Sequence, residues 1–186
     1  MKKRNSNKDF AREFVKNTKQ LGTPFQSSRY LARAVAEQVI GYNVVELGAG
    51  SGPITKAILH EYKSRDKPLK LTVFENNPRL LEHLFEINDD RLKIRGESAE
   101  YFPDYIEDFD CVISGLPLTS MPDDIVHKIL EASTQAQRFV QYKYFPEGDL
   151  LREYFSSVKS KVVFRNMPPL TLVYVCEKPR LISSCK

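Results

Sequence analysis

The feature that most constrains this chain is a glycine-rich loop directly after a short apolar segment. Residues 44–47 read VVEL, which predicts a buried strand, and the loop GAGSGP occupies residues 48–53. Glycine permits sharp turns and lets a ligand approach the backbone closely. A helix beginning at Pro53 would direct its free N–H groups and the positive end of its dipole at an anionic group. This strand–loop–helix unit is typical of α/β folds that bind nucleotides.

An acidic residue follows the next predicted strand. Residues 69–75 read LKLTVFE and end in Glu75, which comes 23 residues after Gly52. An acid at this position commonly binds the hydroxyl groups of a ribose. The loop is not a dinucleotide fingerprint, which needs glycine where Pro53 stands, and no Lys-Ser or Lys-Thr pair makes it a P-loop. Loop, helix and acid together predict a nucleoside cofactor, and the alternative is a glycine turn without a ligand.

Helix-like and strand-like segments alternate along the chain. The pattern predicts helices from Ser27 or Ser28 to Ile40 and over residues 53–62, 78–87, 123–136 and 148–158, and strands over residues 44–47, 69–75, 91–95, 109–114, 138–145, 161–167 and 170–178. The last two strands are too close for a crossover helix, so they must pair antiparallel through a turn at residues 166–169. The expected fold is α/β: a Rossmann-like, doubly wound, seven-stranded sheet, mostly parallel with an antiparallel last strand.

Composition excludes several other classes of protein. The chain has 186 residues, the size of one domain, and its 41% hydrophobic and 28% charged residues exclude a disordered or coiled-coil protein. The cysteines Cys111, Cys176 and Cys185 have no metal-ligand spacing, so we expect no metal site and a reducing, cytoplasmic location. No apolar run approaches the roughly 20 residues of a membrane-spanning helix. We expect a monomer.

Positive charge is concentrated at the amino terminus. Residues 1–20 hold seven basic and two acidic side chains, which leaves a net charge of −1 on the other 166 residues. We expect residues 1–22 to form a basic amphipathic helix on an anionic membrane surface. Nucleic acid is the other polyanion that it could bind, and the alternatives are a frayed terminus or a helix whose phenylalanines cap the cofactor cleft. The expected membrane contacts are Lys8, Phe10, Arg12, Phe14, Lys16 and Lys19.

The glycine loop carries a recognisable pattern. Residues 46–52 read E-x-G-x-G-x-G, and with an acid at the end of the next strand they resemble motifs I and II of the class I S-adenosylmethionine-dependent methyltransferases. The resemblance implies S-adenosylmethionine as the cofactor. It also implies that Glu97 and Ser98, after the third strand, meet the adenine, and the alternative there is a solvated turn. The implied cofactor-binding residues are Glu46, Gly48, Ala49, Gly50, Gly52, Glu75, Asn76, Glu97, Ser98, Ala99, Ser114, Gly115 and Leu116.

The segment after the fourth strand bears on the substrate. It reads S-G-L-P-L over residues 114–118. Methyltransferases that modify amino groups of nucleobases carry N/D-P-P-Y or N-L-P-Y here, where the amide or acid polarises the amine and the aromatic ring stacks on the base. This chain has Gly115 in the amide position and Leu118 in the aromatic position. Both base-handling side chains are absent, which counts against a nucleobase substrate.

A narrower resemblance covers about residues 20–177. Together with S-G-L-P-L, the segments FVQYKY (139–144), NMPP (166–169) and TPFQSSRYLA (23–32) resemble the soluble bacterial phospholipid N-methyltransferases. The chain departs from that family at Ala49, where proline is frequent, and at Glu97, where aspartate is usual. The resemblance implies methyl transfer to the amine of phosphatidylethanolamine and peripheral association with a membrane.

Two tyrosines at the end of the fifth strand are the candidate catalytic residues. Tyr142 and Tyr144 lie on one face of the predicted strand, with Lys143 on the other. Their rings could hold a methylated ammonium by cation–π attraction, and the alternative is packing at the rim. No Ser-His-Asp or Cys-His arrangement is visible. The predicted substrate-binding residues are Leu116, Pro117, Leu118, Tyr142 and Tyr144.

The sequence thus predicts a methyltransferase domain over residues 23–178 and a tail over residues 179–186. The favoured function is N-methylation of phosphatidylethanolamine at a membrane surface. An rRNA adenine N6-dimethyltransferase-like enzyme is the alternative, which the missing amide and aromatic side chains oppose. A catalytically silent adaptor on the same fold is the third hypothesis, which the intact glycines and Glu75 oppose.

Overall fold

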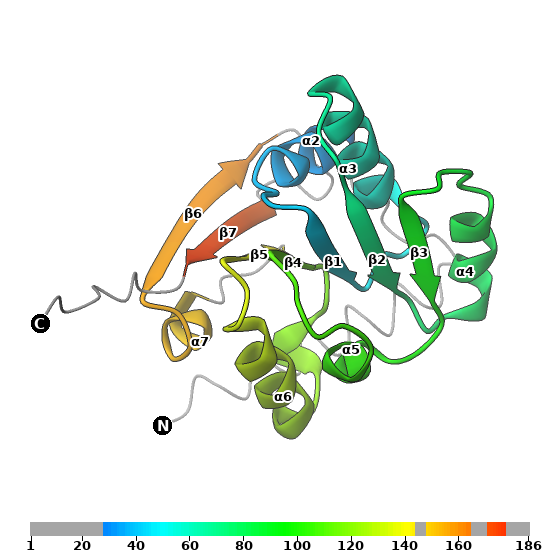
Figure 1. The fold of residues 1–186 in the computed structure, drawn as a ribbon. Coiled ribbons are helices and arrows are strands. Elements are labelled where there is room, and N and C mark those ends of the chain that lie inside the picture. Colours follow the sequence, from blue (N-terminus) through cyan, green and yellow to red (C-terminus); the bar gives the residue numbers. More distant parts are fainter. Residues whose placement is uncertain (1–27, 144–147, 165–170, 178–186) are drawn as a thin grey trace, which may run out of the picture.

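Seven strands form one mixed sheet in a computed structural model that describes residues 28–143, 148–164 and 171–177 (Figure 1). The strand order is β3-β2-β1-β4-β5-β7-β6. The first five strands run parallel to one another, and β7 runs antiparallel to both β5 and β6. The strands are β1 (Asn43–Leu47), β2 (Lys70–Phe74), β3 (Leu92–Arg95), β4 (Cys111–Ser114), β5 (Arg138–Lys143), β6 (Ser157–Val163) and β7 (Thr171–Glu177).

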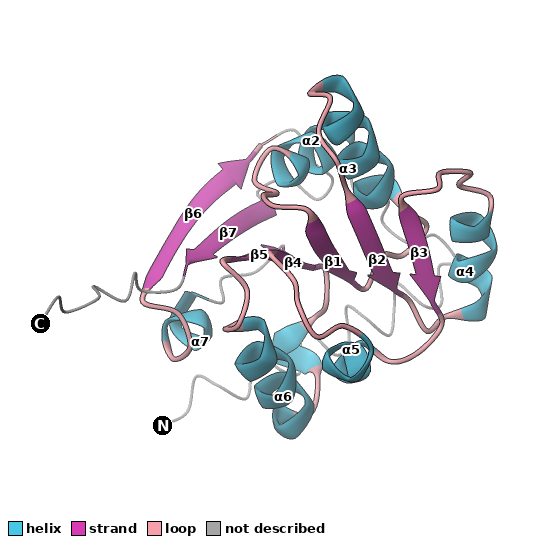
Figure 2. Cartoon of the chain, viewed as in Figure 1, coloured by secondary structure: helices cyan, strands magenta, loops and turns pink. Residues whose placement is uncertain are grey.

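Helices cover both faces of this sheet (Figure 2). The helices α2, α3 and α4 pack on one face, and α5, α6 and α7 pack on the other. Their bounds are α2 (Arg29–Ala36), α3 (Pro53–Ser64), α4 (Pro78–Phe85), α5 (Phe102–Tyr105), α6 (Asp123–Ser133) and α7 (Gly148–Arg152), with short 3₁₀ turns η1 (Ala99–Tyr101) and η2 (Leu118–Ser120). None of the described helices is long and apolar enough to cross a membrane.

The sheet separates two hydrophobic cores. Successive side chains of a strand point to opposite faces, so Val44 enters the core beneath α2 and α3, whereas Val45 and Leu47 enter the core beneath α5 and α6. Residues 44–47 of β1 and all four residues of β4 are buried. Helices on both faces explain why these strands are mostly apolar along their length rather than alternating between apolar and polar residues.

Local chemistry fixes where two of the helices begin. Ser28 precedes α2, and its side chain accepts a hydrogen bond from the backbone N–H of Leu31 at 3.3 Å. Asn77 caps α4 in the same way through Arg79 N at 3.1 Å, and Pro78 follows at the first helical position. Short polar side chains satisfy free N–H groups there, and proline suits a position whose N–H has no partner.

The predicted fold class is confirmed, and some boundaries need correction. The helix expected to reach Ile40 ends at Ala36, because the chain then tightens into a turn in which Gln38 N bonds to Val35 O. The helix expected over residues 148–158 ends at Arg152, since Val158 already pairs with Cys176 in the antiparallel ladder. The expected turn at residues 166–169 lies outside the described residues. The sequence reading also missed α5, η1 and η2.

Candidate active site

The glycine loop lies where the order of the strands reverses. Strand β1 is flanked by β2 on one side and β4 on the other, and α/β sheets bind ligands at the carboxyl ends of strands at such a point. Gly48, Gly50 and Gly52 have φ angles of +73°, +60° and +86°, which glycine adopts without strain. The N–H groups of Gly48 and Ala49 donate to Phe74 O at 2.8 and 3.2 Å, which ties the loop to the end of β2.

Glu75 connects this loop to the segment after β2. Its Oε2 accepts a hydrogen bond from Gly50 N, and its Oε1 accepts one from Asn77 N, both at 2.9 Å. The carboxylate is half-buried, and its neighbour Asn76 is exposed. Two backbone donors therefore orient the acid that the sequence predicts for the ribose.

Glu46 lies under the loop with no access to solvent. Its Oε2 accepts a hydrogen bond from Thr55 Oγ1 of α3 at 2.7 Å, whereas its Oε1 is buried and no described residue bonds to it. Burial raises the pKa of Glu46 to about 8, the nearby charge of Glu75 adds to the rise, and the bond from Thr55 opposes it. A buried acceptor without a partner is costly unless a ligand supplies the donor.

Known proteins share the fold of this chain. No protein-family model matches the chain. The ornithine lipid N-methyltransferase of Singulisphaera acidiphila is 29% identical over an alignment that covers 86% of this chain and 90% of that protein. Precorrin-6y C5,15-methyltransferase from Geobacter metallireducens superposes with a TM-score of 0.62 at 14% identity, over 80% of this chain and 87% of that one. For 1,6-didemethyltoxoflavin-N1-methyltransferase from Burkholderia thailandensis, solved with S-adenosylhomocysteine, the TM-score is 0.62 at 18% identity, over 91% and 87% of the chains.

The glycine loop, the seven-stranded sheet and the curated relative agree on one superfamily. The chain is a class I S-adenosylmethionine-dependent methyltransferase. S-adenosylmethionine is therefore the methyl donor of this methyltransferase.

The residues around the loop fit this cofactor. A Cβ atom on Gly50 would meet no atom within 4 Å, so open space adjoins the loop at the residue whose N–H Glu75 holds. The partnerless Oε1 of Glu46 can accept from the ammonium of the cofactor's amino-acid part. The corresponding Cβ on Gly52 would lie 2.9 Å from the side-chain ends of Leu84 in α4 and of Ile87 after it, so both side chains would have to shift.

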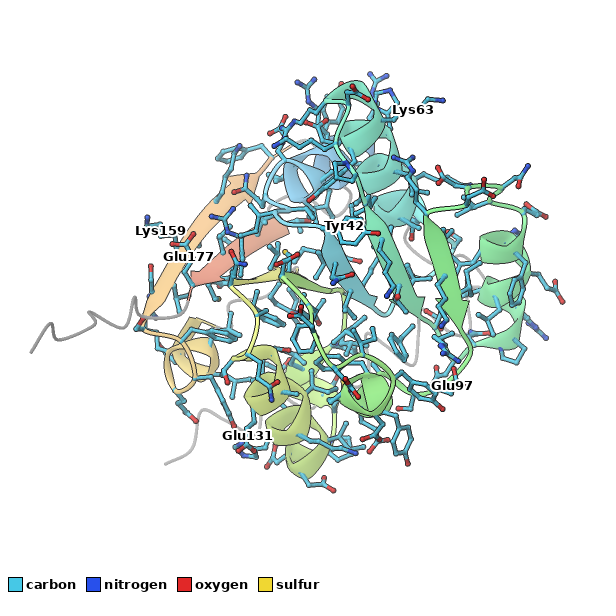
Figure 3. The ribbon with its side chains drawn as sticks, in the orientation of Figure 1. Tyr42, Lys63, Glu97, Glu131, Lys159 and Glu177 are labelled. Carbon is cyan, nitrogen blue, oxygen red and sulfur yellow. The ribbon has the colours of Figure 1, made fainter. Side chains whose placement is uncertain are left out.

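The predicted adenine contacts lie after β3. Figure 3 shows Glu97 at the carboxyl end of that strand. Its Oε1 lies 3.9 Å from Arg95 Nη1, and its Oε2 is buried with no hydrogen-bond partner among the described residues. Ser98 Oγ donates to Glu100 Oε1 at 3.2 Å, and Ala99 is buried in the core beneath α5 and α6. Glu97 thus has an oxygen available to accept, whereas adenine contact by any of the three stays a prediction.

The segment after β4 is held against both neighbouring strands. Gly115 N donates to Leu47 O at 2.9 Å, and Ser114 Oγ accepts from Leu116 N at 3.3 Å. Gln141 of β5 donates through Nε2 to Leu116 O at 2.9 Å. Gln141 is fully buried and its Oε1 has no described partner. The sequence reading did not single out this residue, although a polar side chain directly after the apolar pair Phe139 and Val140 was a usable signal.

The predicted substrate residues occupy different environments. Leu116 lies against the glycine loop, because a Cβ on Gly48 would be 2.9 Å from Leu116 Cδ2. The phenol of Tyr142 adjoins Gly115, which is one of the predicted cofactor-binding residues. Pro117 is half-buried, and Leu118 is only 2% exposed and packs in the core beneath α6. Roles for these residues in substrate binding stay predictions.

Lys143 is a buried cation that the sequence reading assigned no role. Its Nζ donates to Thr119 Oγ1 in η2 at 2.7 Å, so it links the end of β5 to the segment after β4. Burial lowers the pKa of Lys143 to about 7. Its partner Thr119 directly follows the S-G-L-P-L segment, which places this amine beside the candidate substrate loop.

Several predicted residues lie outside the part of the chain that the structure describes. They are Tyr144, the membrane residues Lys8, Phe10, Arg12, Phe14, Lys16 and Lys19, and residues 179–186 of the tail. Within the described ranges, no group of three or more His, Cys, Asp or Glu side chains is arranged to hold a metal ion.

Glu46→Gln is expected to remove a pH-dependent loss of stability. The pKa of Glu46 is about 8 in the folded protein against an ordinary 4.5, so its favourable contribution is full below pH 4.5 and is lost as the pH rises through 8. The melting temperature of Glu46→Gln relative to the unaltered protein should therefore increase from pH 5 to pH 8 and then level off. A rise of about 3 °C or more is expected, since 1 kcal/mol corresponds to roughly 2–4 °C at this size.

Titration of Lys143 does not affect the melting-temperature difference between Glu46→Gln and the unaltered protein. Its lowered pKa gives the opposite trend, with stability gained as the pH rises from about 7, but both proteins contain it and the difference between them cancels its effect. Differential scanning calorimetry without cofactor measures the quantity directly. A melting-temperature difference that stays constant from pH 5 to pH 9 would contradict the assignment of a raised pKa to Glu46.

Proposed function

We propose that this methyltransferase transfers methyl groups to the amine of a phospholipid head group, phosphatidylethanolamine, at an anionic membrane surface. The observation that carries the proposal is the match to a lipid N-methyltransferase over 86% of this chain and 90% of that protein. The segment after β4 supports it, because Gly115 and the buried Leu118 offer neither an amide to polarise a base nor a ring to stack on it.

The bound cofactor supplies an electrophilic methyl group on a sulfonium. The residues of the chain have to hold its two ends and to orient the amine. Glu75 would accept from the ribose hydroxyls while its backbone partner Gly50 N keeps it in place. The buried Oε1 of Glu46, which has no hydrogen-bond partner among the described residues, would accept from the ammonium of the amino-acid part. Holding both reactants in line converts a bimolecular step into an effectively unimolecular one.

The amine has to lose a proton before it reacts. An alkylammonium has no lone pair, so the substrate amine would first release a proton to solvent water. The neutral nitrogen could then accept the methyl group that the bound cofactor would supply. A low-dielectric site favours the neutral amine. The same effect is seen at Lys143, whose own pKa burial lowers to about 7 beside the substrate loop. A comparably dry environment around the substrate amine would ease its deprotonation.

The basic amino-terminal segment, residues 1–20 (the basic head), would bring the enzyme to its substrate. Lys8, Arg12, Lys16 and Lys19 recur at spacings of four, four and three residues, which forms one stripe if residues 8–19 are helical. Each basic residue near an anionic leaflet contributes about 1 kcal/mol. Four such residues are enough for reversible, salt-sensitive recruitment without a lipid anchor.

Labelled methyl transfer tests the substrate directly. The full chain is incubated with labelled S-adenosylmethionine and with vesicles of phosphatidylethanolamine and phosphatidylglycerol, vesicles of ornithine lipid, or unmodified ribosomal RNA. We expect label in the phosphatidylethanolamine extract and none in RNA. Vesicles of phosphatidylcholine are the matched control, since that head group is already fully methylated. Label in RNA with unlabelled vesicles would reverse the choice between the two enzymes.

The same vesicles test whether the basic head binds the membrane. Replacing Lys8, Arg12, Lys16 and Lys19 with glutamine should reduce co-sedimentation at low salt by at least tenfold, while replacing the exposed residues Lys56, Lys63, Lys67 and Lys70 in the same way should not. Equal sedimentation of both variants would mean that the head is not the membrane contact.

A further inference from the structure

Gly115 and Tyr142 fit together as one unit. A Cβ atom on Gly115 would lie 2.3 Å from Tyr142 Oη and 2.6 Å from Tyr142 Cζ, far inside contact distance. The described glycines with left-handed backbone are Gly41, Gly48, Gly50 and Gly52, so the backbone does not demand glycine at 115. The phenol of Tyr142 therefore explains the glycine at this position, since any side chain there would displace it.

The pairing follows from the register of the sheet. Ser114 of β4 lies opposite Gln141 of β5, so the next residue of each strand, Gly115 and Tyr142, continues the same parallel pair. The Cβ position on Gly115 also lies 3.2 Å from Gly48 O. The phenol oxygen thus lies where the carboxyl ends of β1, β4 and β5 meet, between the cofactor loop and the candidate substrate loop.

The distance from Gly115 to the phenol oxygen has a chemical meaning. In asparagine, the amide oxygen lies about 2.4 Å from Cβ, from standard bond lengths. Tyr142 Oη lies 2.3 Å from the Cβ position of residue 115. We infer that Tyr142 supplies, from the neighbouring strand, the polar oxygen that a side chain at position 115 would otherwise supply, and that the Gly115–Tyr142 pair selects a flexible aliphatic amine over a planar base. This inference rests on the proposed function.

The amide oxygen of an asparagine and the phenol oxygen of Tyr142 suit different substrates. An amide presents an acceptor and an NH₂ donor side by side, which matches the amino group and ring nitrogen of a base. A phenol presents one oxygen that accepts from the N–H of an amine, and an aromatic face that attracts its ammonium form. An aliphatic amine offers N–H groups and no ring nitrogen. Leu118 is buried and provides no ring on which a base could stack.

A stability cycle tests the pairing without any substrate. Gly115→Ala should lower the melting temperature because its methyl group collides with the phenol, and Tyr142→Ala should lower it by loss of packing. In the double variant the collision is relieved, so its loss should be smaller than the sum of the two single losses. Losses that add within error would overturn the pairing.

Kinetics test the role of the oxygen in the full chain. Tyr142→Phe keeps the ring and should lower kcat/KM for phosphatidylethanolamine vesicles at least tenfold, with affinity for S-adenosylhomocysteine within twofold of the unaltered protein. Combining Tyr142→Ala with Gly115→Asn returns an amide oxygen to the same place and should raise kcat/KM at least tenfold above Tyr142→Ala alone. Tyr62→Phe is the matched control, because Tyr62 donates to Gly41 O at 2.8 Å near the amino end of β1, away from the carboxyl ends of the strands. It should lower the melting temperature and leave kcat/KM unchanged.

The outcomes separate this inference from the proposed function. Unchanged kcat/KM in Tyr142→Phe, with lipid methylation intact in the unaltered protein, overturns the role of the phenol alone. If Tyr142→Phe still methylates phosphatidylethanolamine and Tyr142→Ala methylates it less, Tyr142 acts by packing alone. That result likewise overturns the role of the phenol. Methylation of RNA by the unaltered protein, with no lipid methylation, overturns the proposed function and the selection of an aliphatic amine together, while the stability cycle still decides the pairing.

Discussion

Gly50→Asn is expected to fold normally and to lose S-adenosylmethionine binding. Gly50 has a φ of +60°, a left-handed conformation that asparagine tolerates better than other side chains. A Cβ there meets no protein atom within 4 Å, so the new side chain costs the fold little and enters the space beside the loop. Because that space adjoins the N–H held by Glu75, the side chain should exclude the cofactor and weaken binding by more than 100-fold.

A second substitution separates occlusion from strain. Gly50→Val combines the same obstruction with a β-branched residue at positive φ, which costs of order 1–3 kcal/mol in backbone strain. Gly50→Val should therefore melt lower than Gly50→Asn, while both fail to bind. Isothermal titration calorimetry measures the affinity and a thermal melt without cofactor measures the strain. Affinity within threefold of the unaltered protein in folded Gly50→Asn would remove the loop from the cofactor site.

Glu75→Ala has the next largest expected effect. The carboxylate accepts from Gly50 N and Asn77 N, each at 2.9 Å, and the same group is proposed to accept from the ribose hydroxyls. A hydrogen bond to a charged group contributes about 1.5–3 kcal/mol, so the cofactor should bind roughly 10- to 150-fold more weakly. The loss of both backbone contacts should also loosen the loop.

Comparison of ligands locates the effect on the ribose. S-adenosylhomocysteine and adenosine should both lose affinity for Glu75→Ala, since both contain the ribose. Glu61→Ala is the matched control, because Glu61 pairs with Arg65 on the exposed side of α3 and not with the loop. Calorimetry that finds adenosine affinity unchanged in Glu75→Ala would assign Glu75 to loop structure alone.

The cofactor half of the site was predictable because its requirements are local. Left-handed glycines and an acid after the next strand are backbone and spacing demands that appear directly in the sequence, and Glu75 does lie beside Gly50. The strands were predictable for a related reason, since helices on both faces bury residues 44–47 of β1 and all of β4, and most of these side chains are apolar. Propensity alone failed at Val158, where pairing with β7 determined the conformation.

The substrate half depends on contacts between distant segments. The sequence places a glycine at 115 and a tyrosine at 142, but only the parallel register of β4 and β5 brings the phenol against that glycine. Gln141 is a similar case, since its bond to Leu116 O joins residues of two strands. No periodicity within one segment encodes such a pairing. The sequence therefore shows that asparagine is absent at position 115, but it does not show that the phenol of Tyr142 lies in its place.

The position of β7 has a consequence for how the protein is made. This strand comes last among the seven, yet it lies inside the sheet and hydrogen-bonds to β5 on one side and β6 on the other. A ribosome therefore releases β5 and β6 before the strand that joins them exists, and both expose free backbone edges during that interval. Exposed edges invite pairing with other chains. Slow translation or early termination within residues 171–177 should thus favour aggregation of nascent chains, even though every residue of the glycine loop has already been synthesised.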